Sequence, residues 1–164
     1  SPIKKQRMDF LVEKAVELGV TDLHPVLTHR TETRKIKTER IKAQIIEAAE
    51  QCERLDVPVL HSPAPLQGVT LNDEIPLYAC VERMDIVDET AQAERIFLPL
   101  AQAIQPGAAG FLIGPEGGFS KPERSRLAAM APAHVVSLGP RILRADTAAV
   151  AAMTLWQQAL GDWG

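Results

Sequence analysis

Cysteine is scarce in this sequence, and long apolar runs are missing. Its 164 residues include only two cysteines, Cys52 and Cys80, which are too few for a disulfide framework or a four-ligand zinc site. We expect two free thiols in a reducing cytoplasm. The first seven residues hold no apolar signal core, and no run of about 18 apolar residues occurs. The sequence therefore predicts a cytoplasmic protein with no membrane partner.

Familiar metal and nucleotide motifs are also missing. Neither the Gly-Lys-Ser/Thr of a P-loop nor the glycine pattern of a dinucleotide-binding fold occurs. The histidines show no metal-ligand spacing with one another or with the cysteines, so we expect no bound metal. They are His24, His29, His61 and His134.

Positive charge is not in excess overall. The chain has 18 Lys and Arg against 21 Asp and Glu, a formal net charge of −3, which disfavours a uniformly basic nucleic-acid binder. Residues 30–42 nevertheless carry six basic and two acidic side chains. This stretch fits either a solvated helix entrance or a surface that faces phosphate groups. Its basic residues are Arg30, Arg34, Lys35, Lys37, Arg40 and Lys42.

Apolar residues follow helical spacing in some segments and form short β-branched runs in others. Helices are predicted for residues 8–18, 38–54, 94–104 and 145–160, and from Ser120 onward, where Ser120, Pro122 and Glu123 form a capping pattern. Residues 62–76 are predicted as a loop or an irregular helix. Strands are predicted for residues 23–27, 57–60, 77–81, 110–113 and 135–137.

This alternation predicts an α/β fold with a mostly parallel sheet and helices on both faces. Ligands of such sheets bind beyond the carboxyl ends of the strands. Two glycine-containing loops follow predicted strands in this way, and they are the candidate ligand-binding loops.

The first loop spans residues 114–120. Its three glycines permit a ligand to lie against the backbone. Pro115 lacks an N–H, and Glu116 places a carboxylate where a phosphate would bind, so the loop suits phosphate poorly. It suits a nucleoside-like ligand without phosphate, such as S-adenosylmethionine, whose sulfonium and amino groups are cationic. The alternative is a plain strand-to-helix turn.

The second loop, residues 138–144, again joins a strand to a helix. Arg141 and Arg144 could clamp a carboxylate or an RNA phosphate, or they are surface arginines beside a helix cap made by Asp146 or Thr147. The helix after this loop is apolar over more than one face, which predicts that protein packs against it on two sides. We expect one of these sides to contact another subunit, in a homodimer.

Together these loops resemble the RsmE family of ribosomal RNA methyltransferases, in the knotted SPOUT superfamily. Two upstream segments, residues 14–20 with Pro25 and residues 47–54 with Pro58, agree with the family pattern, so the likeness covers about residues 4–160. The motifs that carry it are Gly114-Pro115-Glu116-Gly117-Gly118-Phe119-Ser120 with Glu123, and Leu138-Gly139-x-Arg141-Ile142-Leu143-Arg144-x-Asp146-Thr147-Ala148.

The resemblance implies a C-terminal trefoil knot, bound S-adenosylmethionine, a homodimer, and methylation of N3 of one uridine in 16S ribosomal RNA of the small subunit. Residues 1–164 then correspond to the methyltransferase domain, without the N-terminal PUA-like barrel usual in the family. Asp146 stands where the family usually has glutamate, and Thr31 follows Arg30 where serine is common.

The same resemblance suggests roles for individual residues. Arg144, Arg30 and Glu116 are the catalytic candidates: an arginine would stabilise the uracil anion, and Glu116 would accept a proton or orient the cofactor. The expected RNA-binding residues are Arg30, Arg34, Lys35, Gln51, Arg54 and Arg141. The expected cofactor-binding residues are Cys80, Ile113, Gly114, Pro115, Glu116, Gly117, Gly118, Leu138, Gly139, Ile142, Leu143, Arg144, Thr147 and Ala148.

Two other functions are compatible with these residues. A SPOUT enzyme that methylates the ribose 2′-oxygen could use the same glycine loops and arginines. A non-catalytic module that binds RNA would use the loops only as structural turns.

Overall fold

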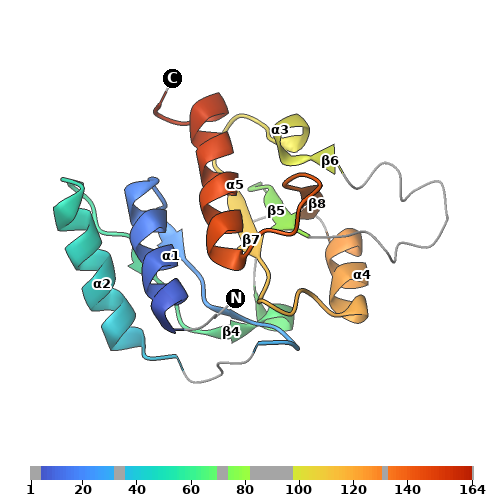
Figure 1. Ribbon diagram of the computed structural model, residues 1–164, viewed down its shortest axis with the longest axis horizontal. Coiled ribbons are helices and arrows are strands. Elements are labelled where there is room, and N and C mark those ends of the chain that lie inside the picture. Colours follow the sequence, from blue (N-terminus) through green and yellow to red (C-terminus); the bar gives the residue numbers. More distant parts are fainter. Residues whose placement is uncertain (1–4, 32–35, 70–73, 82–97, 131–132, 164) are drawn as a thin grey trace.

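The computed structural model describes residues 5–31, 36–69, 74–81, 98–130 and 133–163 (Figure 1). Its helices are α1 (Lys5–Glu17), α2 (Thr38–Gln51), the 3-10 turn η1 (Leu66–Gly68), α3 (Leu100–Ala103), α4 (Lys121–Ala129) and α5 (Ala145–Leu160). Its strands are β1 (Asp22–Leu23), β2 (Val26–Leu27), β3 (Val59–Leu60), β4 (Ala64–Pro65), β5 (Leu77–Cys80), β6 (Leu98–Pro99), β7 (Gly110–Ile113) and β8 (Ala133–Ser137).

All strand pairs in the described residues are parallel. The main sheet has four strands in the order β6-β8-β5-β7, with β5 in register with both neighbours. Two smaller pairs, β1-β3 and β2-β4, lie beside it. This arrangement confirms the predicted α/β fold with a parallel sheet.

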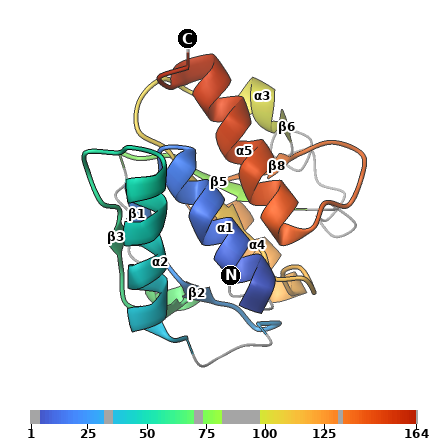
Figure 2. The same cartoon turned by 60° about the vertical axis from the view of Figure 1, so that its left-hand side comes forward.

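Helices cover both faces of the main sheet (Figures 1 and 2). Successive residues of a strand point to opposite faces, and Tyr78 and Ala79 of β5 are both fully buried. Ala79 belongs to a core that includes Leu127 of α4, whereas Tyr78 packs with Leu100 of α3 and Ala152 of α5. The main sheet is therefore the middle of three layers, as the sequence predicts.

A separate layer is formed by α1 and α2, which lie side by side (Figures 1 and 2). Their shared core is aliphatic, and Leu23 of β1 and Leu60 of β3 pack against it. No helix of the described segments is long and apolar enough to cross a membrane. The buried residues of this core are Val12, Val16, Ile41, Ile45, Ala48 and Ala49.

Several predicted boundaries are wrong, mostly at prolines. The strand predicted over residues 23–27 is split into β1 and β2, because Pro25 has no N–H to donate to a ladder. The helix predicted over residues 94–104 begins only at Leu100, after Pro99 of β6, and its first four residues lie outside the described part. Strand β3 begins only after Pro58.

Two further predictions differ in length. The second helix ends at Gln51 rather than at residue 54, and Cys52 is its C-cap. The segment predicted as a loop holds β4 and η1, both short. By contrast, α5 has the predicted bounds, since it starts and ends at residues 145 and 160.

Candidate active site

A cleft of about 240 Å³ opens where β5 and β7 end. Both glycine loops border it, as expected for the carboxyl ends of parallel strands. Arg30, a catalytic candidate, also lines it. The predicted cofactor residues that line the cleft are Cys80, Ile113, Gly114, Pro115, Gly117, Gly118, Ile142, Leu143 and Ala148.

The cleft differs from the predicted set in two ways. Four lining residues were not predicted: Val81, Phe119, Ala145 and Arg124. The first three adjoin predicted site residues in the chain, but nothing in the sequence singles out Arg124. The predicted residues that do not line the cleft, in the part of the chain described, are Glu116, Leu138, Gly139, Arg144 and Thr147.

The first glycine loop is shaped by a tight turn and a buried ring. The N–H of Gly118 donates to the carbonyl of Pro115 over 2.8 Å, and Gly118 has a φ of +65°, which favours glycine. A Cβ at Gly114 would lie 3.0 Å from Cε2 of Phe119, a ring that is only 2% exposed. The loop therefore presents mainly backbone to the cleft.

Glu116 points toward α1. Its carboxylate forms an ion pair with Arg7, which lies in the first half of that helix. Both side chains are about a quarter to a third exposed. This contact joins the first glycine loop to α1. The two residues are 109 positions apart in the chain, so sequence spacing does not indicate the contact.

Arg30 lies against the same loop. Its Nη1 donates to the carbonyl of Gly117 over 2.7 Å, and a Cβ at Gly117 would lie 3.4 Å from Cβ of Arg30. The remaining guanidinium N–H groups leave Arg30 able to bind a second acceptor. Glycine at position 117 thus allows the arginine stem to pack on the loop.

Glu123 connects the Arg30 turn to the loop. This carboxylate is only 4% exposed. One oxygen accepts the N–H of His29 at 2.7 Å, and the other accepts the N–H and hydroxyl of Ser120, both at 2.8 Å. Burial raises the pKa of Glu123, but these hydrogen bonds outweigh it and the net shift is downward.

The turn that carries Arg30 is also stabilised by hydrogen bonds between its own residues. The N–H of Thr28 donates to Oγ1 of Thr31 over 2.9 Å, and the N–H of Thr31 donates back to the carbonyl of Thr28. Both threonines are buried. With Glu123 holding His29, the backbone on either side of Arg30 is fixed.

Arg124 brings a second guanidinium to the cleft. Its Nε is buried and has no hydrogen-bond partner in the described residues. A buried donor without a partner costs about 1–3 kcal/mol. A carboxylate or phosphate oxygen of a ligand would satisfy it with a charge-assisted hydrogen bond.

The second glycine loop begins at a sharp bend. Gly139 has a φ of +110°, and its N–H donates to Oγ of Ser137 over 3.1 Å. The predicted helix cap is wrong: Arg144 is the N-cap of α5, and Asp146 lies inside the first turn, where it accepts the N–H of Thr147. A carboxylate in the first turn still complements the helix dipole.

The predicted RNA-binding residues are dispersed. Arg141 is exposed on the second loop and Gln51 is exposed at the end of α2, whereas Arg34 and Lys35 lie outside the described residues. Arg54 is engaged within the protein: its Nη1 donates to the carbonyls of Val16 and Val20 over 2.8 and 2.9 Å, and the guanidinium pairs with Asp56. These bonds cap the end of α1 and give Arg54 a structural role that does not require RNA.

Comparison with known proteins identifies the class. Residues 1–157 match the family described as the RNA methyltransferase domain, and the chain belongs to this family. The small-subunit ribosomal RNA methyltransferase E of Rickettsia conorii is 32% identical over 152 residues, which cover 92% of this chain and 59% of that protein. The chain thus spans about three-fifths of the length of this relative.

Two solved structures share the fold. Ribosomal RNA small subunit methyltransferase E of Neisseria gonorrhoeae, bound to S-adenosylmethionine, is 31% identical with a TM-score of 0.78, covering 100% of this chain and 65% of that one. A protein of Legionella pneumophila, described as a methyltransferase in complex with the same cofactor, is 30% identical with a TM-score of 0.75, covering 98% and 64%.

Proposed function

We propose that residues 1–164 form the catalytic domain of an S-adenosylmethionine-dependent methyltransferase that modifies N3 of a uridine in 16S ribosomal RNA. The observation that carries this proposal is the cleft between two glycine loops, lined by Arg30 and Arg124, in a chain of the RNA methyltransferase domain family. The names of the Rickettsia and Neisseria relatives support the substrate, and the two cofactor-bound structures support the cofactor.

The cleft fits S-adenosylmethionine in its chemistry. The loops at Gly114–Gly118 and at Leu143 would hold its adenosine and methionine parts mainly through backbone groups. The Nε–H of Arg124, which has no partner in the described residues, would donate a hydrogen bond to the methionine carboxylate. When bound, the cofactor supplies an activated methyl group.

Arg30 is the residue that we assign to the target base. Uracil N3 reacts after its proton passes to solvent, and the resulting negative charge spreads to O2 and O4. Arg30 is held by the carbonyl of Gly117 through one N–H and has further N–H groups to donate. It would therefore stabilise the anion at a carbonyl oxygen of the base.

Glu116 is assigned a positioning role. Its ion pair with Arg7 directs the carboxylate toward α1, and it does not line the cleft formed by the described residues. We infer that it holds the first glycine loop in place rather than removing the N3 proton. Arg144, exposed at the N-cap of α5, stays a catalytic candidate that would stabilise the uracil anion.

A homodimer, the trefoil knot and a cytoplasmic location belong to the same proposal. Leu155 of α5 is 40% exposed and Ile142, on the cleft, is 56% exposed. The cleft is also slightly smaller than the range of about 300–1,000 Å³ typical of small-molecule sites. A second copy against α5 would cover the apolar side chains and enlarge the site. Light scattering that gives a monomeric mass at micromolar concentration would contradict this part.

Calorimetry and methyl transfer test the proposal together. The chain should bind S-adenosylmethionine and transfer its tritiated methyl group to small ribosomal subunits. Arg30→Ala should lower the rate by about 10²–10³-fold, the loss expected when one charge-stabilising donor is removed. Arg126→Ala is the matched control, because that arginine is exposed on α4 and does not line the cleft. No cofactor binding at millimolar concentration would refute the proposal.

A further inference from the structure

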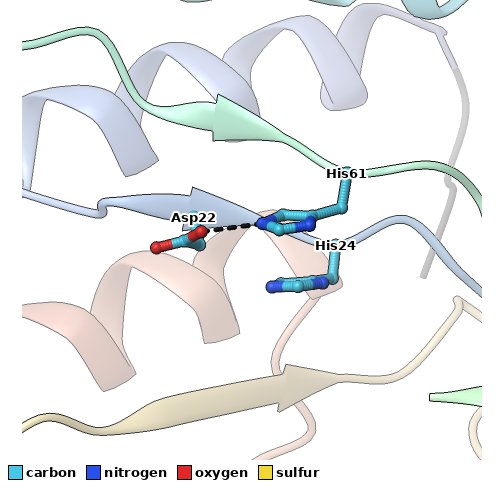
Figure 3. Close-up of side chains that lie close together, drawn as sticks. All are labelled: Asp22, His24 and His61. Atoms are coloured by element: carbon cyan, nitrogen blue, oxygen red, sulfur yellow. Dashed lines mark hydrogen bonds and ion pairs between the residues drawn. The ribbon is translucent and has the colours of Figure 1, made fainter. Parts of the chain in front are cut away.

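Three side chains that could bind a metal gather where β1 and β3 end (Figure 3). Nε2 of His61 lies 2.7 Å from Oδ1 of Asp22. The rings of His24 and His61 are stacked, with centroids 3.8 Å apart and an interplanar angle of 12°. One ligand atom from each of the three residues lies within 4.8 Å of the other two.

The backbone places these side chains together. Asp22 and His24 are two residues apart on extended chain, so they share a face. The β1-β3 register pairs Leu23 with Leu60, and His24 and His61 follow directly after this pair. The N–H of His61 donates to the carbonyl of Leu23 over 2.9 Å. The ladder therefore sets His61 opposite His24.

The same segments are held beyond the histidines. Each histidine is followed by a proline within two residues, and β2 pairs with β4 in the same parallel sense. The N–H of Ala64 donates to the carbonyl of Pro25 over 3.1 Å. Hydrogen bonds thus fix the backbone both before and after the two rings, which lowers the entropy cost of assembling a site.

Two of the three groups, Asp22 and His24, have pKa values that are shifted toward their metal-binding forms. Burial, and then the neighbouring charge of His61, lower the pKa of His24. The hydrogen bond from His61 lowers the pKa of Asp22. Neutral imidazoles and an ionised carboxylate are the forms that bind metal.

We propose that Asp22, His24 and His61 form a binding site for a divalent transition-metal cation of the zinc type. Two imidazole nitrogens and one carboxylate oxygen are a donor set that suits Zn²⁺, Co²⁺, Ni²⁺ and Cu²⁺, and three protein ligands leave positions for water. The ring of His24 is exposed and that of His61 is half-buried, so the His24 ring has room to turn a nitrogen toward the centre that Asp22 and His61 share. A bound ion would tie β1 to β3.

This site is independent of the proposed methyl transfer. None of its three residues lines the glycine-loop cleft. The sequence predicts no metal because His24 and His61 are 37 positions apart, and only the parallel pairing of two short strands brings them together. Linear spacing reveals metal sites whose ligands share one loop or helix, and this cluster has no such pattern.

Titration of the metal-free chain with Zn²⁺ tests the proposal by calorimetry, and Co²⁺ gives a visible spectrum for the same site. We expect one ion per chain with micromolar affinity. Loss of a group that merely supports a ligand already costs about 10–100-fold in affinity, so His24→Ala and His61→Ala should each weaken binding about tenfold or more. His134→Ala is the control, since His134 stacks on Tyr78 away from the cluster.

A second readout does not depend on the variants. At a hundredfold excess over the dissociation constant, Zn²⁺ should raise the melting temperature by about 5–10 °C, and a chelator should reverse the rise. Circular dichroism confirms that each variant is folded. No binding at millimolar Zn²⁺, or binding that is unchanged in both His24→Ala and His61→Ala, would overturn the site whatever the outcome of the methylation assay.

Discussion

Replacing Glu123 tests the link between the two halves of the candidate active site. Its carboxylate accepts three hydrogen bonds at 2.7–2.8 Å while only 4% exposed. Glutamine is the same size, but its NH2 group cannot accept a hydrogen bond, so at least one buried donor of His29 or Ser120 loses its partner. Hydrogen bonds to a charged group contribute about 1.5–3 kcal/mol each, and we expect Glu123→Gln to lower the free energy of unfolding by about 2–3 kcal/mol.

The effect should depend on pH in a defined direction. The pKa of Glu123 is lowered in the folded protein from its ordinary value of 4.5. Its ionised form therefore stabilises the fold above about pH 4.5, and this contribution is lost as the pH falls through the folded-state pKa. The stability difference between wild type and Glu123→Gln should be constant at neutral pH and shrink progressively below pH 4.5.

Urea unfolding followed by circular dichroism, at neutral pH and in acid, measures both quantities. Glu39→Gln is the matched control, because the side chain of Glu39 is 85% exposed, and it should change stability by less than about 0.5 kcal/mol. Glu123→Gln should also slow methyl transfer, since Arg30 follows His29 directly. A stability loss under about 1 kcal/mol, or one that does not change with pH, would refute the reasoning.

Two further residues of the cleft give separate predictions. Arg124→Gln should weaken S-adenosylmethionine binding about tenfold, the equivalent of one charge-assisted hydrogen bond, while Lys121→Gln on the same helix should not; calorimetry that finds equal affinities would remove Arg124 from the cofactor site. Burial raises the pKa of the Cys80 thiol to about 12, so iodoacetamide near pH 8 should leave Cys80 unmodified in the folded protein and modify it in urea. Rapid labelling of Cys80 in the native chain, detected by peptide mass spectrometry, would contradict the raised pKa of this thiol.

The sequence predicts the local features of this fold better than its pairings. The last helix is found at the predicted bounds, and the capping box of Ser120 and Glu123 is present, because apolar spacing and caps act within a few residues. The split between β1 and β2 was missed, although Pro25 is the visible signal. Each of these short strands pairs with a different partner, which apolar patterning does not specify.

The same distinction holds for the candidate site. The two glycine loops are continuous motifs, and the structure brings most of their predicted residues to one cleft. The contacts of Glu116 with Arg7 and of Glu123 with His29 join residues about a hundred positions apart. Only packing of α1 and of the Arg30 turn against the first loop creates them. Their partners therefore could not be identified from spacing.

Nucleoside analysis of methylated RNA tests the central claim most directly. Small ribosomal subunits that lack the modification would be incubated with the chain and S-adenosylmethionine, digested, and analysed by mass spectrometry. The account predicts 3-methyluridine from the 16S ribosomal RNA, formed about 10²–10³-fold more slowly with Arg30→Ala and at the wild-type rate with Arg126→Ala. A ribose-methylated nucleoside, or no methylated product despite bound cofactor, would contradict it.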